Sequence, residues 1–286
     1  MKKLFLVAVS IALLACQEQS NTNLKTLYPL PKKLKEVSGI TYFPEANIIY
    51  TLEDSGNKNA IYAINSEGKL AKTITISNAE NVDWEDITKD KAGNIYIGDF
   101  GNNDNERKDL CIYKVAKNQL NKDLAVAEYK ISFSYPEQTE FPPKKKELFY
   151  DVEGFFEQGG YFYLFTKNRS KGFDGTAFIY KVKNARGTQK AVKIGTFKTC
   201  DNYNHCVLTS ATISPDEKKV VLLSHDKIVV FKDFKGDLFH KGKQTEVSLN
   251  HFTQKEAIVF KDNSTLLIAD EKTNKVGGKV YEFRLK

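Results

Sequence analysis

The stretch IIYTLED, residues 48–54, is a run of apolar residues that ends at acids, and it has four counterparts further along the chain. They are NIYIGDF (94–100), YFYLFTK (161–167), VVLLSHD (220–226) and TLLIADE (265–271). Each is followed by a shorter apolar run that contains at least one aromatic residue, as in AIYAI at residues 60–64. Repeats at intervals of tens of residues are typical of stacked or radial units, none of which can bury its faces alone.

Each complete repeat contains four short runs with the composition of β-strands. The first repeat has SGITYF, IIYTLE, AIYAIN and KTITIS, with no helical periodicity between them. Turn residues occupy the intervals, as at Ser214-Pro215-Asp216. Four strands per unit predict an all-β chain that forms a five-bladed β-propeller of four-stranded antiparallel blades. A ring of six blades is the alternative.

The last repeat is one strand short. It contains only EAIVFKD, TLLIADE and KVYEFRLK, whereas the segment LKTLYPL at residues 24–30 precedes the first repeat and has no other partner. Propellers remove an exposed sheet edge by letting one terminus complete the last blade. We therefore expect residues 24–30 to close the ring, and residues 24–286 to form one domain.

The first residues have the composition of an export signal. Two lysines precede an apolar run at residues 4–14, which is too short to cross a bilayer, because about 20 helical residues are needed. The run ends in Leu13-Leu14-Ala15-Cys16, which resembles the bacterial lipoprotein box. We expect a signal peptide at residues 1–15, a lipidated Cys16 and a polar tether at 16–23. An ordinary signal peptide followed by a chance cysteine is the alternative.

Lipidation would set the location of the protein. Two or more acyl chains, at about 0.8 kcal/mol per buried CH₂, hold a protein on a membrane almost irreversibly. We therefore expect a cell-envelope protein that is anchored to a bacterial membrane, namely the outer membrane, and faces the periplasm or the exterior.

The charge of the chain argues against one class of partner. The formal net charge is +7, but nearly all cations are lysines scattered along the chain. Proteins that bind nucleic acid favour arginine for bidentate contacts, so we expect no nucleic-acid partner. The expected ligand is a small molecule, a glycan or a protein, and the expected state is a monomer.

The cysteines fit an oxidising compartment. Cys200 and Cys206 flank five residues between two predicted strands, a spacing that suits a loop-closing disulfide worth about 2 kcal/mol. A metal pair with His205 is the alternative, which we disfavour because a zinc site needs about four ligands. Cys111 lies in a predicted strand and is expected to be a small buried apolar side chain.

Charged residues recur where first strands begin and second strands end. In an up-and-down blade these two points lie at the same end of the sheet, so we expect both sets to converge on one mouth of the central channel. The acids are Glu36, Asp54, Glu85, Asp86, Asp99, Glu153, Glu256 and Glu271, and the cationic or imidazole side chains among them are Lys167, Arg169 and His225.

Clustered carboxylates repel one another unless they are protonated, paired with cations or bridged by a hard metal. An oxygen-rich set suits Ca²⁺ or Mg²⁺ better than zinc. Taken singly, each acid is better explained as a cap on neighbouring backbone, as in Asx turns. The hypothesis of a site therefore depends on the convergence of the whole set. The other histidines, His205, His240 and His251, have no acid at a fixed spacing and are expected at the surface.

Several strings resemble those of bacterial envelope β-propellers, many of which are lipoproteins. They are Asp83-Trp-Glu-Asp, Ile97-Gly-Asp-Phe-Gly-Asn-Asn103, Phe133-Ser-Tyr-Pro, Phe165-Thr-Lys-Asn-Arg169 and Ala269-Asp-Glu271. More distantly, the chain is similar to phytase-like esterase domains and to gluconolactonase-type propellers. In the latter, a carboxylate of the first blade and Asp or Asn residues of later blades hold a divalent metal. The resemblance implies Glu36 as the first ligand and Asp99, Asn102 or Asp270 as later ones.

Two functions are consistent with these residues. The first is a non-catalytic module whose ligand contacts Glu36, Asp54, Asp86, Arg169, Glu256 and Glu271. The second is a metal-dependent hydrolase of a phosphate ester, lactone or carboxylic ester, with a Ca²⁺-like ion as Lewis acid and Glu85 or Glu153 as base. Lys167, Arg169 and His225 would then neutralise a bound anion. The sequence has no G-x-S-x-G elbow, H-E-x-x-H motif or P-loop, which favours the binding module.

Overall fold

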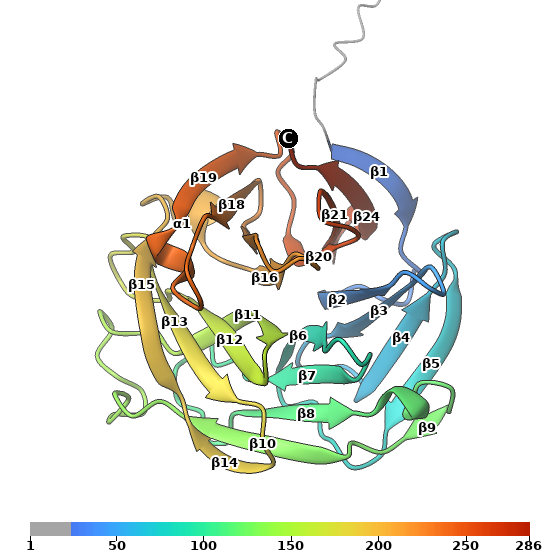
Figure 1. Ribbon diagram of the computed structural model, residues 1–286, viewed down its shortest axis with the longest axis horizontal. Helices are drawn as coiled ribbons and strands as arrows, with labels where there is room; N and C mark the ends of the chain where they lie inside the picture. Colours follow the sequence, from blue (N-terminus) through green and yellow to red (C-terminus); the bar gives the residue numbers. More distant parts are fainter. Residues whose placement is uncertain (1–23) are drawn as a thin grey trace, which may run out of the picture.

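The computed structural model describes residues 24–286, and Figure 1 shows its sheets arranged radially around a central axis. Within these residues, five four-stranded antiparallel blades form the ring, which confirms the predicted five-bladed propeller over the six-bladed alternative. The predicted signal peptide, Cys16 and the tether lie outside the described residues.

The first four blades share one topology, in which successive strands are hydrogen-bonded neighbours. Blade one contains β2 (Val37–Phe43), β3 (Ile48–Glu53), β4 (Ala60–Ile64) and β5 (Leu70–Ile76). Blade two contains β6 (Trp84–Lys89), β7 (Ile95–Asp99), β8 (Cys111–Val115) and β10 (Tyr129–Ser134). Blade three contains β11 (Asp151–Gln158), β12 (Tyr161–Lys167), β13 (Thr176–Lys183) and β15 (Val192–Lys198). Blade four contains β16 (Ser210–Ile213), β17 (Val220–Leu223), β18 (Lys227–Lys232) and β19 (Lys243–Ser248).

Blade five is completed by the first strand of the described chain. It contains β20 (Lys255–Phe260), β21 (Thr265–Asp270) and β24 (Lys279–Arg284), and β1 (Leu24–Pro29) pairs antiparallel with β24. In Figure 1 the blue β1 therefore lies against the dark red β24. The predicted closure of the ring by this segment is confirmed.

Three short features escaped the sequence analysis. The strands β9 (Leu124–Ala125) and β14 (Gly187–Lys190) add in parallel to the outer edges of blades one and two, and β14 reaches blade two from the blade-three segment. The strands β22 (Lys272–Thr273) and β23 (Val276–Gly277) form a small separate hairpin. Strands of four residues or fewer are too short to show a period of two. In addition, β9 and β14 pair with strands that are far away along the chain.

The helices are single turns in connections. They are η1 (Lys117–Gln119), α1 (Tyr203–Cys206) and η2 (Phe239–Lys241). The disulfide between Cys200 and Cys206 is present, with a Cα–Cα distance of 5.4 Å, and Cys111 is free and buried, as predicted. Within residues 24–286 no helix has the length and hydropathy needed to cross a membrane.

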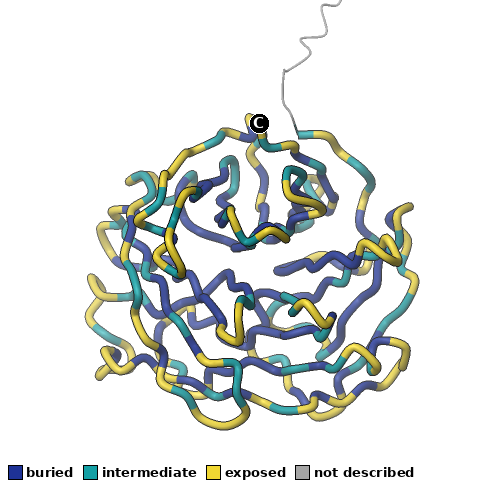
Figure 2. Tube along the Cα trace, viewed as in Figure 1, coloured by how far each residue is buried: buried dark blue, intermediate teal, exposed yellow. Residues whose placement is uncertain are grey.

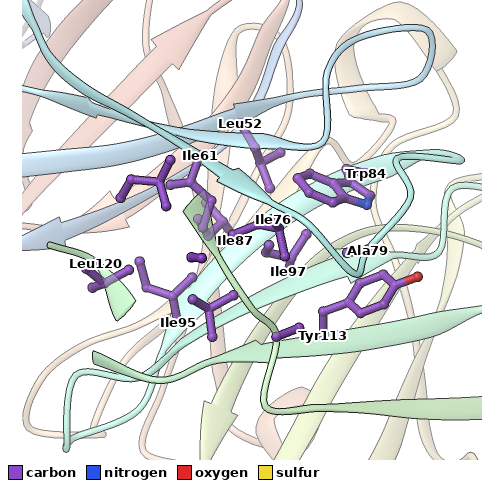
Figure 3. Packing of buried hydrophobic residues seen from close by; sticks show 14 of the residues in the cluster. Leu52, Ile61, Ile76, Ala79, Trp84, Ile87, Ile95, Ile97, Tyr113 and Leu120 are labelled. Atoms are coloured by element: carbon purple, nitrogen blue, oxygen red, sulfur yellow. The ribbon is translucent and has the colours of Figure 1, made fainter. Parts of the chain in front are cut away.

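The hydrophobic core lies between neighbouring blades. Figure 2 shows that buried residues follow the inner strands, whereas exposed residues gather on outer strands and loops. Figure 3 shows the cluster between blades one and two, where Ile61 and Leu52 face Trp84 and Ile97. The indole nitrogen of Trp84 donates a hydrogen bond of 2.9 Å to the Glu80 carbonyl. Each large side chain buried here contributes about 1.5–3 kcal/mol, so the contacts between blades hold the ring together.

The first strands form the inner wall of the ring. Each packs against the first strand of the blades on either side, from β2 through β6, β11 and β16 to β20 and back to β2. All five run in the same direction along the channel, so their first residues gather at one end and their last residues at the other.

Candidate functional site

A recurring β-bulge positions the acids of the channel. The register shifts at the start of the first strand in blades one, two, three and five. The bulged residues are Ser38, Glu85, Glu153 and Glu256. Because a bulge turns a side chain away from its usual direction, three of these blades present a glutamate at equivalent places around one mouth.

Glu36 was expected to lie together with these glutamates. The strand register shows instead that Glu36 does not occupy the bulged position in its own blade. Glu36 lies two residues before the bulged Ser38, the position that Asp83 and Asp151 occupy in blades two and three. Asp83 and Asp151 were not predicted as site residues. The signal that would have found them is the acid two residues before the bulge in each of blades one, two and three.

The acids at this mouth influence one another. Burial raises the pKa of Asp54 to about 7, and Glu36, Asp83 and Glu256 add to the shift. Burial likewise raises the pKa of Glu271 to about 8, with Glu256, Asp54 and Glu36 as further causes. These influences act over short distances, so acids of blades one, two and five share one region. We call this region the acidic mouth: Glu36, Asp54, Asp83, Glu85, Asp151, Glu153, Glu256 and Glu271.

Glu85 is the most isolated of these carboxyls. Only 8% of the residue is exposed, and the described residues provide its carboxylate with no hydrogen-bond donor. Burial raises its pKa well above the ordinary range, and Glu153, Asp151 and Asp83 raise it further. A buried carboxyl without a donor favours the protonated form or a cationic partner.

Blade three carries the cations of the acidic mouth. Lys167 Nζ lies 3.0 Å from Glu153 Oε2. Arg169 contacts two acids, with Nε 2.6 Å from Asp151 Oδ2 and Nη2 2.9 Å from Glu153 Oε1. The backbone N–H of Asn102 donates to the remaining oxygen of Asp151 at 2.7 Å. All four carboxylate oxygens of Asp151 and Glu153 therefore have a donor.

Two further contacts fix the Arg169 guanidinium. Its Nη1 donates to the Tyr203 hydroxyl at 3.1 Å, and its Nη2 donates to the side-chain carbonyl of Asn103. Burial lowers the pKa of neighbouring Lys167, but Glu153 and Glu256 outweigh this effect and raise it overall. Both cations therefore stay charged at neutral pH.

One group has the spacing of metal ligands. Glu85, Asp151 and Glu153 each offer an oxygen, and these atoms lie within 4.8 Å of one another. The group could hold a metal ion, but Ca²⁺ takes six to eight oxygen ligands, and here Lys167 and Arg169 already bond to two of the three residues. A metal would have to displace these cations, so only Glu85 is free to accept one without rearrangement.

The ligand set implied by the resemblance to gluconolactonase-type propellers does not form a cluster in the described part of the chain. Asp99 Oδ1 accepts hydrogen bonds from the Asp83 N–H at 3.1 Å and from Arg107 Nη2 at 2.9 Å. The Asn102 amide accepts from the Arg107 N–H at 2.9 Å and donates to the Tyr150 carbonyl at 3.1 Å. These side chains shape the loop after β7.

The other two members of that set lie in blades one and five. Asp270 accepts from the Lys279 N–H at 2.8 Å and from the Tyr281 hydroxyl at 2.7 Å, so both oxygens hold β21 to β24. Glu36 is exposed and accepts from the Asn57 side chain at 2.8 Å. Glu36 is thus the one member of the set that lies in the acidic mouth.

Asp86 lies in the narrow part of the channel below the acidic mouth. Only 1% of it is exposed, and its carboxylate accepts from the N–H groups of Ile87 at 2.8 Å and Phe155 at 3.1 Å, and from the Ser210 hydroxyl at 3.3 Å. A Cβ at Gly39 would lie 2.7 Å from the Asp86 Cα, so blade one packs directly against it. Asp86 therefore joins three blades across the axis.

Two histidines, His205 and His225, lie beside acids. His225 lies beside the acidic mouth, with Nε2 3.3 Å from Glu256 Oε1 and Nδ1 3.1 Å from the Asn204 carbonyl. His205 was expected to have no acid partner, but its Nδ1 lies 2.6 Å from Asp226 Oδ2. The two residues are 21 positions apart, and only the packing of α1 against the β17–β18 turn brings them together.

Lys255 is a second buried cation that the sequence analysis missed. It is fully buried, and its Nζ donates to the His225 carbonyl and the Thr253 hydroxyl, both at 2.9 Å. Burial lowers its pKa to about 8. The signal was present in the repeat, since Lys255 occupies the position of the apolar Val37 and Trp84 in the other blades.

Comparison with known proteins yields distant neighbours among solved structures. No protein-family model and no curated protein sequence matches this chain. Among solved structures, an inactive variant of virginiamycin B lyase from Staphylococcus aureus, with quinupristin, is 14% identical with a TM-score of 0.43, and covers 87% of this chain. This chain spans 66% of that protein's length. The WD40 repeats of RRP9 are 10% identical with a TM-score of 0.47, and the match covers 92% of this chain and 97% of theirs. Both are β-propellers.

Proposed function

We propose that this protein is a cell-envelope β-propeller whose acidic mouth binds a positively charged ligand or partner. The observation that carries the proposal is the surplus of carboxyl groups, among which Glu85 and Glu271 have no side-chain hydrogen-bond donor in the described residues. Lys167 and Arg169 form their ion pairs with Glu153 and Asp151. A cation is the ligand that relieves the remaining repulsion.

Protons occupy part of this site when no cation is bound. Asp54 and Glu271, with pKa values raised to about 7 and about 8, hold protons in the folded protein that they release on unfolding. The folded state is therefore favoured at low pH, and this contribution is lost as the pH rises from about 4 to about 8. A bound cation would displace the protons, so its affinity should increase over the same range.

Melting temperatures measured with added cations test this proposal. At about pH 8, Ca²⁺ or spermidine should raise the melting temperature, because a ligand that binds only the folded state stabilises it by about 2.7 kcal/mol at a hundredfold excess over Kd. At about pH 5 the response should be much smaller, because Asp54 and Glu271 are protonated. The ionic strength is matched with NaCl.

Two variants make this test specific. Glu85→Gln should weaken the response, whereas Glu67→Gln, at an exposed residue paired with Lys69 on the first-blade hairpin, should leave it unchanged. If neither cation raises the melting temperature at either pH, the acids only support the fold and the proposed binding function is wrong.

The metal-dependent hydrolase remains a second candidate, because Glu85, Asp151 and Glu153 have the spacing of metal ligands. Glu153 is held by Lys167 and Arg169, which leaves Glu85 as the carboxylate that is available to the reaction. Hydrolysis of phosphate esters or lactones that requires Ca²⁺ and is lost in Glu85→Gln would establish this function. If spermidine raises the melting temperature and Ca²⁺ does not, the calcium-dependent hydrolase is ruled out and the cation-binding function is supported.

We also propose that lipidation at Cys16 holds the protein on the outer membrane, an inference supported by the sequence of residues 1–16. The variant Cys16→Ala should move the protein from the membrane fraction to the soluble envelope fraction, because no acyl chain remains to partition into the bilayer. Cell fractionation followed by immunoblotting measures this change. Membrane association that persists in the variant would show that another feature provides the anchor.

A further inference from the structure

A cavity of about 680 Å³ lies at the end of the channel opposite the acidic mouth. All five blades line it through the last residues of their first strands and the hairpins that follow. Representative residues, one from each blade, are Pro44, Ala92, Gly160, Pro215 and Lys261. Its volume falls in the range of about 300–1,000 Å³ that is usual for small-molecule sites. We call it the lower cavity.

The packed centre of the channel separates the lower cavity from the acidic mouth. Asp86 is buried there and bonds to backbone of blades two and three, and a Cβ at Gly154 would lie 2.3 Å from the Ala211 nitrogen of the next blade. Molecules in the lower cavity therefore do not reach the acids of the mouth, and the two ends of the channel are independent sites.

The wall of the lower cavity is largely apolar. Aromatic and branched side chains from four blades contribute to it, namely Tyr42, Phe156, Ile213, Val259 and Phe260. Ile213 and Val259 are half-buried, although each lies in an inner strand. An apolar wall of this kind suits the hydrophobic body of a ligand.

The acids of the lower cavity are engaged by the protein itself. Asp90 accepts from the Asn94 N–H at 2.9 Å and from the Tyr96 hydroxyl at 3.0 Å. Glu157 accepts from the Gly160 N–H at 2.7 Å. These carboxylates hold their own hairpins and offer little to a ligand.

Three lysines and three acids line the lower cavity, and one of these lysines, Lys89, forms no ion pair in the described residues. Glu217 pairs with Lys91, and Lys261 Nζ lies 2.7 Å from Glu282 Oε2 on the outer side. Lys89 is half-buried, and within residues 24–286 it has no carboxylate partner. Its Nζ lies 5.1 Å from the centre of the Phe43 ring, a weak contact that leaves its N–H donors free.

We propose that the lower cavity binds a small amphipathic organic anion. The apolar body of the ligand packs against the half-buried Ile213 and Val259, and its carboxylate or phosphate group accepts hydrogen bonds from Lys89. A charge-assisted hydrogen bond in a half-buried setting is about twice as strong as a neutral one, so Lys89 selects anions over neutral molecules of the same shape.

Fluorescence titration with 8-anilinonaphthalene-1-sulfonate tests the proposal, because this probe combines an apolar aromatic body with one anionic group. The folded protein should bind one equivalent, and decanoate or 2-naphthoate should displace it. Displacement by decanoate alone points to an aliphatic ligand, and displacement by 2-naphthoate to an aromatic one. The uncharged N-phenyl-1-naphthylamine should bind about tenfold more weakly, since it makes no charge-assisted bond.

Three variants locate the probe. Lys89→Gln should weaken binding about tenfold, and Thr88→Trp, at a half-buried residue of the wall, should abolish it by filling the cavity. Lys91→Gln, whose lysine is already paired with Glu217, should have little effect. Circular dichroism confirms that each variant is folded. The proposal would be overturned by the absence of saturable binding, or by binding that survives Thr88→Trp in a folded protein. As a control at the other end of the channel, Glu85→Gln should leave probe binding unchanged.

Discussion

Deletion of residues 24–30 is expected to remove most of the stability of the propeller. The strand β1 covers the outer edge of blade five by pairing with β24, and Leu30 is buried while Leu27 and Tyr28 are partly buried. The loss of about three such side chains, at about 1.5–3 kcal/mol each, approaches the whole stability of a typical domain, about 5–15 kcal/mol. The freed edge of β24 would also offer unpaired backbone groups to other chains.

The closing strand also joins blade five to blade one, which adds to the expected effect. The Leu30 N–H donates to the Gly278 carbonyl at 2.8 Å. Gly68, in the left-handed region at φ 77°, lies so close that a Cβ there would be 2.7 Å from the Tyr28 ring. Removal of the strand would therefore open the ring at the junction of its first and last blades.

Chemical denaturation and size-exclusion chromatography measure this prediction. The deletion variant should aggregate or unfold at much lower denaturant, whereas Lys25→Ala, at an exposed residue of the same strand, should change the free energy of unfolding by less than about 0.5 kcal/mol. A monomeric deletion variant with unchanged stability would mean that β1 is dispensable for closure.

The variant Arg169→Met should lower the free energy of unfolding by about 3–5 kcal/mol at neutral pH, the usual cost of removing one partner of a buried ion pair. Arg169 contacts Asp151, which is fully buried, and Glu153, which is nearly so. Without the guanidinium, Asp151 keeps only the Asn102 N–H, and Glu153 keeps only Lys167.

The loss of unfolding free energy caused by Arg169→Met should depend on pH. Burial already raises the pKa of Glu153 well above its ordinary range, with Lys167 and Arg169 opposing the shift. Removal of Arg169 raises that pKa further, so the deficit is present at neutral pH and shrinks as the pH falls and the carboxyl takes up a proton. Equal destabilisation at acidic and neutral pH would indicate lost packing rather than lost charge.

A matched surface pair serves as the control for Arg169→Met. Lys198 Nζ lies 2.6 Å from Asp174 Oδ2, but both side chains are largely exposed. Because water screens such pairs, Lys198→Met should cost less than about 1 kcal/mol. Urea denaturation of both variants across the pH range gives the comparison.

The sequence led to a prediction of where the candidate site lies, but it could not predict the partners of the site residues. The common direction of the first strands is the reason that Glu36, Asp54 and Glu85 were expected at one end of the channel. Their partners could not be predicted, because Arg169 meets Asp151 and Glu153 only after β12 pairs with β11. Whether a metal ion, a proton or a lysine balances the carboxylate charge depends on distances of a few ångströms between side chains. The spacing of residues along the sequence does not specify these distances.

The sequence by itself predicted five blades, with six as the alternative, together with the four antiparallel strands of each blade and the closing strand. These depend on local patterns, since apolar runs of four to six residues and the turns between them recur in every repeat. The disulfide between Cys200 and Cys206 also followed from the sequence, because its two ends are six positions apart and only a short loop separates them.

The tertiary structure alone decided which groups meet across the ring. Asp86 and Ser210 are 124 positions apart, yet the closure of the propeller brings their side chains to 3.3 Å. The lower cavity likewise exists only where five hairpins, each unremarkable by itself, surround one axis. The physical reason is that strand formation depends on residues that are neighbours in the sequence. Burial, cavity shape and charge balance depend instead on contacts between blades, and the separation of two blades along the chain does not predict how close they lie in space.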